Sequence, residues 1–525
     1  MRPAERAAAA RRARYSSAVW PILAVVLSAA LACAPSSSPL QRQPTTVRAP
    51  RKEALEAALG GRDAAKPYVR SRLVGWPERL LVDRGTLPTD DDEFLKRLAR
   101  DTWRGLAALS DRENGLPINH VRFGASLDAA DAKIGDYASA SDLGLYLIAI
   151  VAAHELGLIP ESEALARLTA ALDSIDRLET WHGFPFNFYD TTTLERTSDF
   201  VSFVDSSWLA AGFMVARSSF PQLDERCSAW LAARDFGRFY DARRKLMSHG
   251  EYVGPEQRSP YHYGVFYTEA RLGSLVAIGK GDVPAEHWFA MSRTPPPPGI
   301  ASDAAAHVEP ARVHPWPSAY YQWKGLHYVP SWGGSMFEAL MPVLVLDERR
   351  YAPSSLGRND EVHAEVQRRY ALEDLGLPVW GMSPSWQPSG ERYAEHGVPP
   401  LGFQGYRSDA VTPHAAALAL AVTPREAIAN LRELARRYDV YGDYGFYDAV
   451  DPRSGTVARV DLALDQAMIL IALANHLEDG AIQRRFAADP IAQAALPLLR
   501  DENFFEGGSS LQTSTRPGGG DPPKL

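Results

Sequence analysis

The chain has 525 residues, with 64 acidic and 56 basic side chains and a formal net charge of −8 at pH 7. An acidic chain without long basic runs is poorly suited to binding phosphates, so nucleic acid is excluded as a partner. Two cysteines are present, Cys33 and Cys227, and no Cys/His spacing indicates a structural metal site. We therefore expect neither a metal ion nor another cofactor.

Residues 1–33 have the features of an export signal. Five arginines precede an apolar stretch over 18–32, which is broken by Pro21 and is too short for a comfortable membrane span. The stretch ends Ala30-Leu31-Ala32-Cys33, which resembles a bacterial lipoprotein cleavage site, where the cysteine carries the lipid. Ala30 departs from the usual leucine, so ordinary signal cleavage is the alternative. We expect an exported protein, in the periplasm or held at the outer membrane by lipid on Cys33.

The rest of the chain is predicted to form one domain with flexible ends. Residues 34–52 are rich in Ser and Pro and indicate a tether, and residues 507–525 indicate a loose tail. Residues 53–506 are predicted to fold as a single domain. Removing the signal leaves Cys227 without an intrachain partner, so we expect a monomer without an internal disulfide.

Two kinds of helical pattern alternate within residues 53–506. The amphipathic segments are 93–109, 161–179, 222–246, 357–375, 424–438 and 482–499. The segments that are apolar throughout or rich in small residues are 142–156, 203–216, 266–278, 335–346, 412–422 and 461–477. Each apolar segment except the third is followed by a clear amphipathic one; the third is followed only by 283–292. This alternation predicts an all-α (α/α)6 barrel with six inner and about six outer helices. A helical solenoid would need a repeat of fixed length, which is not seen.

Acidic residues gather at the starts of the predicted inner helices. Asp142, Asp205, Glu269 and Glu338 lie in the first turns of the first four, and the sixth carries Asp461 and Asp465, while the fifth begins Thr412-Pro413-His414. In an alternating barrel the inner helices are parallel, so these acids should converge on one rim. Helix dipoles favour anions there.

Helix capping is the competing interpretation for several of these acids. Ser335 with Glu338 fits a capping box, as do Ser139 with Asp142 and Ser202 with Asp205. Glu269 has a phenylalanine three residues earlier and no such explanation, although an ion pair with a basic neighbour could also place it there. We therefore predict that Glu269 is the working acid.

The segments that lead to this rim are rich in aromatic residues. Tryptophan and tyrosine among acids, amides and Arg271 suit a sugar, which offers C–H faces for stacking and hydroxyls for hydrogen bonds. Cleavage of a glycosidic bond needs one protonated carboxyl group at the leaving oxygen and one carboxylate that serves water or the anomeric carbon. An acidic, aromatic rim supplies both.

Several short motifs resemble those of the bacterial glycoamylase-like domain, a family that includes endo-β-1,2-glucanases and the transglycosylating domain of cyclic β-1,2-glucan synthases. They are Phe188-Tyr-Asp190-Thr-Thr-Thr, Phe203-Val-Asp205-Ser, Tyr267-Thr-Glu269-Ala-Arg-Leu, Val283-Pro-Ala-Glu-His287-Trp-Phe, Trp332-Gly-Gly-Ser-Met-Phe-Glu338-Ala-Leu-Met-Pro and Gly445-Phe-Tyr-Asp448-Ala. The resemblance extends from about Phe94 to Phe505. It implies an (α/α)6 barrel and a glycoside hydrolase that acts on a β-glucan, above all a β-1,2-linked one.

The resemblance also implies site residues. Glu269 matches the family's general-acid position, and Asp205 matches an acid at the start of the preceding inner helix, so these two are the predicted catalytic residues. The predicted substrate-binding residues are Asp190, Asn187, Arg271, Tyr267, Tyr263, His287, Trp332, Glu338, Trp380 and Asp448. The expected partner is an oligo- or polysaccharide.

One departure from the family bears on the mechanism. Where the synthase domains have an acid after Trp-Gly, this chain has Pro384 within Met382-Ser383-Pro384-Ser385. The change favours an inverting hydrolase over a retaining transglycosylase. A starch-type glucoamylase, a disaccharide phosphorylase and a glycan-binding surface lipoprotein are the alternatives; the intact acids favour an enzyme.

Overall fold

The computed structural model describes residues 51–76, 86–124, 126–254, 257–293, 321–388, 392–403 and 406–504. The predicted signal sequence, Cys33 as the predicted lipid site, most of the predicted tether and the predicted C-terminal tail lie outside the described residues. The first described helix, α3 (Arg51–Ala58), begins inside the predicted tether. Within the described ranges, no helix combines the length and apolarity needed to cross a bilayer.

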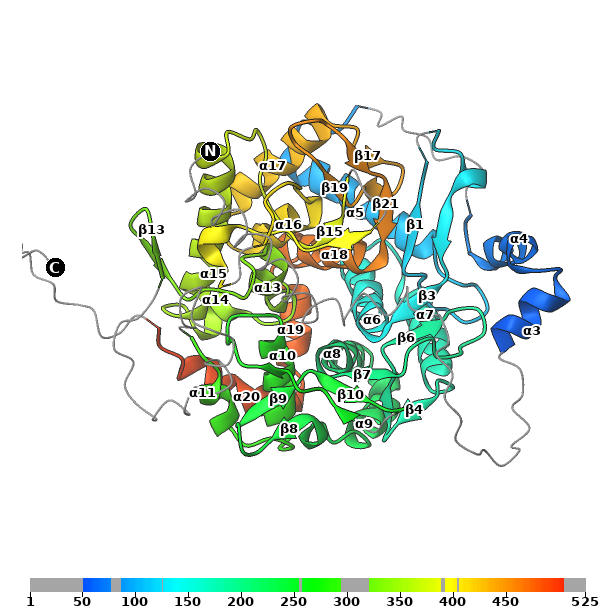
Figure 1. The fold of residues 1–525 in the computed structure, drawn as a ribbon, viewed down its shortest axis with the longest axis horizontal. Helices are drawn as coiled ribbons and strands as arrows, with labels where there is room; N and C mark the ends of the chain where they lie inside the picture. The colour runs from blue at the N-terminus through cyan, green and yellow to red at the C-terminus, as the bar shows by residue number, and fades with distance from the viewer. Residues whose placement is uncertain are drawn as a thin grey trace, which may run out of the picture.

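Six mostly apolar helices correspond to the predicted inner type and lie around the centre of the molecule (Figure 1). They are α6 (Ala140–Glu155), α8 (Phe203–Ser219), α10 (Ala270–Gly279), α13 (Met336–Leu340), α16 (Pro413–Leu418) and α18 (Ala463–Leu477). Helix α6 contacts α8 and α18, α8 contacts α10, and α16 contacts α13 and α18. Arg271 joins α10 to α13 by donating to the main-chain carbonyls of Glu338 and Ala339. Each of the six helices therefore has two neighbours within the set.

The packing of α6 on α8 depends on a pair of glycines. A Cβ on Gly144 would lie 2.3 Å from the main-chain oxygen of Trp208, and one on Gly212 would lie 2.6 Å from the oxygen of Gly144. Only glycine permits the two helices to approach so closely. The small residues that marked these segments in the sequence thus set the distance between them.

A second set of helices packs outside the first. It comprises α5 (Asp91–Ala108) on α18, α7 (Glu161–Ile175) on α6, α9 (Asp224–Ala232) on α8, α15 (Leu356–Arg369) on α13, α17 (Pro424–Arg437) on α16 and α20 (Pro490–Arg500) on α10. The other α-helices of the described residues, besides α3, are α4 (Arg62–Arg72), α11 (Glu286–Ala290), α14 (Glu348–Tyr351) and α19 (Ala481–Ala487). The outer partner of α10 comes from the C-terminal end of the chain, which explains why no clear amphipathic segment follows it directly in sequence.

The prediction of one long helix over 222–246 is wrong. Helix α9 ends at Ala232, and the chain continues into β8 (Tyr240–Asp241) and β9 (Leu246–Ser248). Asp235 accepts a hydrogen bond from the main-chain N–H of Gly237, a local turn that competes with helix continuation. Both residue types favour turns, so this signal was present in the sequence.

Short antiparallel strands connect the helices and were not predicted. Three-stranded sheets are formed by β2 (Lys133–Gly135), β1 (His120–Arg122) and β21 (Val460–Leu462), by β11 (Gln257–Arg258), β10 (Gly250–Tyr252) and β7 (Phe200–Ser202), and by β12 (His262–Tyr263), β9 and β8. The pairs are β3 (Tyr137–Ser139) with β6 (Phe188–Asp190), β4 (Thr180–Trp181) with β5 (Phe184–Pro185), β13 (Tyr321–Trp323) with β14 (Leu326–Tyr328), β15 (Ser385–Trp386) with β16 (Tyr393–Ala394), β17 (Tyr441–Gly442) with β18 (Gly445–Phe446), and β19 (Ala449–Val450) with β20 (Val457–Ala458). Runs of two or three residues cannot show period-2 alternation. Strands β3, β7 and β21 lead directly into α6, α8 and α18, so they fix the starts of three inner helices.

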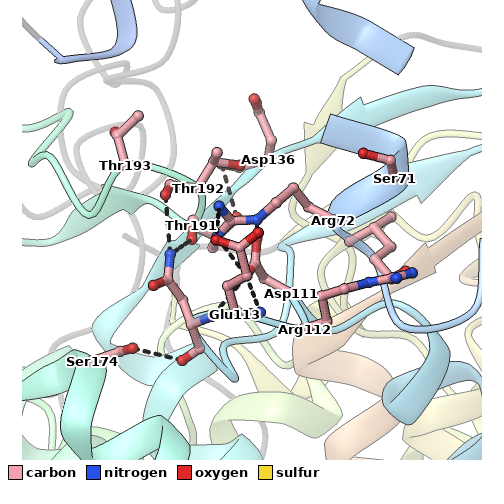
Figure 2. A network of polar contacts seen from close by, with 12 residues as sticks. Ser71, Arg72, Asp111, Arg112, Glu113, Asp136, Ser174, Thr191, Thr192 and Thr193 are labelled. Atoms are coloured by element: carbon pink, nitrogen blue, oxygen red, sulfur yellow. Dashed lines mark hydrogen bonds and ion pairs between the residues drawn. The ribbon is translucent and has the colours of Figure 1, made fainter. Parts of the chain in front are cut away.

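The N-terminal helices are held to the domain by polar contacts (Figure 2). Arg72, at the end of α4, donates to both carboxylate oxygens of Asp111 at 2.9 and 2.8 Å and to Glu113 at 2.7 Å. Asn114 in turn donates to the main-chain carbonyls of Thr191 and Thr192. The network ties α4 to the segment that follows β6.

Candidate active site

Carboxyl groups at the starts of the inner helices act electrostatically on one another. Asp142 and Asp205 lie in the first turns of α6 and α8, Glu269 immediately precedes α10, and Glu338 and Asp465 lie in the first turns of α13 and α18. Burial is the main cause that raises the pKa of all five. Repulsion from Asp205 adds to the shift at Asp142 and Glu269, and repulsion from Asp142 adds to it at Asp465. These acids therefore lie near one another, as the alternating pattern predicted.

Glu269 is a rim acid whose carboxylate caps no helix and is partly exposed, whereas the side chains of Asp205 and Asp465 are buried. It directly precedes the first residue of α10, makes no side-chain cap hydrogen bond and is partly exposed. Burial within the surrounding protein raises its pKa from 4.5 to about 7, and the charges of Glu338 and Asp205 push in the same direction. Arg271 and the main-chain N–H of Glu269 itself oppose the shift. Near neutral pH this carboxyl group can both hold and release a proton, as a general acid must.

The predicted capping box at Asp142 is confirmed, whereas Asp205 forms only half of one. Asp142 accepts from the main-chain N–H of Ser139 at 2.8 Å and donates its own N–H to the Ser139 hydroxyl. At Asp205, the hydroxyl of Ser202 accepts the main-chain N–H at 3.2 Å. Its carboxylate instead accepts from the Ser141 hydroxyl at 2.7 Å, which links α8 to α6.

The capping box at Glu338 is also confirmed, and the carboxylate accepts hydrogen bonds from the preceding turn. Oε2 accepts from the Ser331 hydroxyl at 2.9 Å and from the main-chain N–H of Ser335 at 3.2 Å. The main-chain N–H of Gly333 lies 3.0 Å from both oxygens. Three donors therefore hold the Glu338 carboxylate within the protein, and two of them bind Oε2 alone. Glu338 holds the turn over residues 331–335 and affects Glu269 through its charge.

Arg271 and Tyr267 are structural rather than substrate-binding, contrary to the prediction. The guanidinium of Arg271 is fully buried and binds both oxygens of Glu348, at 2.8 and 2.9 Å. The hydroxyl of Tyr267 is also buried and donates to Asp360. Because their segment is apolar on nearly every face, its sequence did not show that both side chains point away from the rim.

The predicted roles of His287 and Trp380 are also wrong. His287 is fully buried, and its ring nitrogens lie 2.8 Å from the hydroxyl of Ser274 and 2.8 Å from the main-chain oxygen of Lys245. The ring of Trp380 is buried, and its main chain forms a pair of hydrogen bonds with Asn430. The ring of His287 thus joins two segments beneath the surface, and the main chain of Trp380 is bound to α17 through Asn430.

Asp190 is the last residue of β6 and Asn187 immediately precedes the strand. Their side chains differ in how many hydrogen bonds they form. Asp190 accepts from the main-chain N–H groups of Thr192 and Thr193 and from Lys52, whose Nζ lies 2.5 Å away. Its carboxylate therefore fixes a turn and anchors α3. These contacts account for its burial without a bound sugar. The side-chain oxygen of Asn187 is buried and has no hydrogen-bond partner in the structure, so Asn187 stays a candidate for binding substrate.

Two of the predicted aromatic residues lie in the surroundings expected of a sugar site. Tyr263 is half-buried and packs on the ring of His249 at 4.3 Å. Burial, followed by the charges of Glu269 and Asp205, raises its pKa well above 10. Trp332 is half-buried 5.5 Å from the ring of Phe403. Tyr263 is thus the aromatic residue linked most directly to the two predicted catalytic acids.

Asp448, predicted to bind substrate, belongs to a buried cluster with His414 and Asp465. One ligand atom from each lies within 4.8 Å of the others, so the three could hold a metal ion. Nδ1 of His414 is 2.7 Å from Asp465, yet neither ring nitrogen and neither oxygen of Asp465 has a partner with hydrogen-bond geometry. Burial raises the pKa of Asp465 to about 7 and that of Asp448 well above 3.8, so both carboxyl groups can instead be neutralised by protons. The three residues come from separate segments, which is why no spacing revealed the cluster.

The charges of the rim acids also act on two tyrosines, Tyr393 and Tyr406, that the sequence analysis did not name. The charges of Asp465 and Asp448 add to burial in raising the pKa of Tyr393, and those of Glu338, Glu395 and Glu269 do so at Tyr406. Both lie in the long segment between α15 and α16, which has no clear period. Nothing in the sequence indicated where this segment would lie in the folded domain.

Comparison with known families agrees with this architecture. Residues 300–490 match the family model described as "Putative glucoamylase", and residues 97–257 match a model of a family of unknown function, DUF3131. The match over residues 300–490 agrees with the glycoamylase-like resemblance that the motifs predicted.

Two characterised relatives extend the similarity to most of the chain. It is 24% identical to the cyclic β-(1,2)-glucan synthase of Rhizobium meliloti, over 78% of this chain and 18% of that protein. It is 21% identical to an exo β-1,2-glucooligosaccharide sophorohydrolase of Parabacteroides distasonis, over 87% of this chain and 65% of that protein. The chain thus spans less than two thirds of the length of either relative.

Solved structures share the fold. The endo-β-1,2-glucanase from Chitinophaga pinensis, crystallised with sophorotriose and glucose, has a TM-score of 0.65 and 17% identity, with 78% of this chain and 98% of that chain covered. A β-1,2-glucanase from Parabacteroides distasonis has a TM-score of 0.63 and 17% identity, with 79% and 61% covered.

Proposed function

We propose that the protein is a glycoside hydrolase that cleaves a β-glucan, specifically a β-1,2-linked one. The observation that carries this proposal is Glu269, a partly exposed rim acid that caps no helix and has a pKa of about 7. The β-1,2 linkage is taken from the relatives and neighbours, which are named for β-1,2-glucans.

The proposed fold is an (α/α)6 barrel. Its support is the set of inner helices, each with two neighbours in the set, and the outer helix that packs on each of them. In such a barrel the inner N-termini face one end, where their dipoles and the segments before them frame a cleft. We also propose that the domain acts as a monomer and that residues 53–506 form one catalytic unit.

In the proposed reaction, Glu269 donates its proton to the glycosidic oxygen as the bond between that oxygen and the anomeric carbon breaks. A water molecule adds to the anomeric carbon, and a carboxylate takes the water's proton. Asp205 is the proposed carboxylate because it lies on the neighbouring helix and its charge acts on Glu269. The products are two shorter sugars, with Glu269 left as a carboxylate and Asp205 as a carboxylic acid; proton exchange with solvent restores both groups.

We further propose that the reaction inverts the anomeric configuration, because Pro384 stands where the synthase domains have an acid. Inverting enzymes separate the two carboxyl groups by roughly 6.5–9.5 Å, which leaves room for water. Polarimetry or proton NMR of the first product would distinguish an initially inverted anomer from a retained one.

The test of the overall function is the release of reducing ends from a panel of glucans. β-1,2-Glucan, laminarin and starch would be incubated side by side with the purified domain. Release from β-1,2-glucan alone supports the proposal. Release from starch alone would point to a starch-type glucoamylase. Binding of a glucan without any release would point to a glycan-binding protein.

A further inference from the structure

The turn that holds Glu338 is covered by a second segment, residues 396–403 and 406–408. The main-chain N–H of Val398 donates to the oxygen of Gly334 at 2.9 Å, and that of Phe403 donates to the oxygen of Ser331 at 3.0 Å. Tyr406 continues this pattern, with its main-chain N–H 3.3 Å from the oxygen of Gly333. Tyr406 is therefore fixed by main-chain contacts to the same turn that fixes Glu338.

Gly333 provides the space for the ring of Tyr406. A Cβ on Gly333 would lie 2.0 Å from the ring carbon Cε2 of Tyr406, and 2.3 Å from Cζ, the carbon that bears the hydroxyl. Any larger residue would displace the ring. The Trp332-Gly333-Gly334 motif is thus required both to turn the chain around Glu338 and to seat this tyrosine.

The hydroxyl group of Tyr406 is oriented inward and lacks a partner. The residue as a whole is half-buried, but its hydroxyl oxygen is shielded from water and has no hydrogen bond in the structure. Glu338, whose charge raises the pKa of this phenol after burial, already accepts from the Ser331 hydroxyl and from the main-chain N–H groups of Gly333 and Ser335. Glu269 also acts on the same phenol. A buried polar group without a partner requires an explanation, and a ligand is one.

We propose that the hydroxyl of Tyr406 is a hydrogen-bond donor to the substrate, to an oxygen of the sugar unit whose bond Glu269 cleaves. The acidic surroundings keep the phenol protonated, so it acts as a donor throughout the working pH range. This inference rests on the proposed function, because it assigns a contact within the same site. It places the substrate between Glu269 and the turn at Gly333.

Tyr406→Phe tests the proposal, since it removes only the hydroxyl and leaves the ring against Gly333. On β-1,2-gluco-oligosaccharides we expect kcat/KM to fall about 10-fold or more, the usual scale for a lost substrate hydrogen bond. The pH at which activity declines should not move, because Glu269 keeps its surroundings. Tyr438→Phe is the matched control and should behave like the wild type, since its hydroxyl donates to the main-chain oxygen of Pro452, and burial and the charges of Arg437, Glu433 and Asp451 act on its pKa.

Two further measurements separate the outcomes. Thermal melts show whether Tyr406→Phe is folded. Titration of β-1,2-gluco-oligosaccharide into Glu269→Gln, and into the double variant that also carries Tyr406→Phe, measures sugar affinity in the absence of turnover. Wild-type kcat/KM in folded Tyr406→Phe, or unchanged sugar affinity in the double variant, would overturn the proposed contact alone. If the wild type neither cleaves nor binds any glucan, the proposed function fails and the contact fails with it.

Discussion

Arg271 and Glu348 form a two-point ion pair inside the protein, with both side chains fully buried and Nε 2.8 Å from Oε1. This pair answers a question that the sequence left open. Arg271 follows Glu269 by two residues, and an ion pair between the two would have made Glu269 a structural carboxylate. Because Glu348 takes the guanidinium instead, Arg271 lowers the pKa of Glu269 only partly, and that pKa stays at about 7.

Replacing Glu348 should therefore affect both stability and the pH dependence of activity. Glu348→Gln leaves the charge of Arg271 without its main partner, and breaking a buried pair costs about 3–5 kcal/mol of unfolding free energy. The uncompensated positive charge should lower the pKa of Glu269, so activity should decline at a lower pH than in the wild type. Denaturant unfolding and a pH–rate profile measure the two effects. Glu361→Gln, which removes a partly exposed partner of Arg358, is the control and should change neither.

The buried acids of the rim should make stability fall as pH rises. The pKa of Asp465 is raised from 3.8 to about 7, so the folded protein binds this proton more tightly than the unfolded chain. That stabilisation is complete below about pH 4 and is lost as the pH rises through about 7. Asp465→Asn cannot ionise, so its unfolding free energy relative to the wild type should improve by roughly 1 kcal/mol or more between pH 5 and pH 8.

Thermal or denaturant melts at the two pH values measure this difference. Asp451→Asn is the control, because the pKa of Asp451 is lowered and its titration lies below pH 5. A constant difference between Asp465→Asn and the wild type across this range would contradict protonation of the cluster.

The cluster of His414, Asp448 and Asp465 should work without a metal ion. If protons neutralise its carboxyl groups, dialysis against a chelator should leave both Tm and activity unchanged. Added zinc or manganese should also leave Tm unchanged. A rise in Tm with either ion that His414→Ala abolishes would contradict this expectation and identify the cluster as a metal site.

Export and anchoring can be tested at Cys33. If the cysteine carries lipid, Cys33→Ser should move the protein from the membrane fraction to the soluble periplasmic or culture fraction. Cys227→Ser is the control, since Cys227 is buried within the domain and should not alter fractionation. Equal partitioning of Cys33→Ser and wild type would argue against the lipid anchor.

Much of the helical architecture could be predicted because the residues that a helix buries recur at a regular spacing in the sequence. The apolar and glycine-containing segments became α6 and α8, and the capping boxes at Asp142 and Glu338 were visible as serine–acid spacings. The helix predicted over 222–246 failed because periodicity outweighed the local turn at Asp235. The two- and three-residue strands carry no period at all.

The site was harder to predict, because side-chain direction depends on tertiary contacts. Arg271 and Tyr267 flank Glu269 in sequence, yet both point into the core, where Glu348 and Asp360 from distant segments receive them. Tyr406 reaches the acids from a segment without periodicity, through contacts with a glycine turn. The motifs therefore led to a proposed acid, Glu269, but did not indicate which side chains surround it.

The most direct test of the central claim is the turnover of Glu269→Gln on β-1,2-glucan, measured with the pH–rate profile of the wild type. The substitution keeps the shape of the side chain and removes the transferable proton. We predict a fall in kcat of roughly 10²–10⁴-fold with little change in KM, and wild-type activity that declines above about pH 7 as Glu269 ionises. Near-normal turnover by folded Glu269→Gln on every glucan that the wild type cleaves would contradict the assignment.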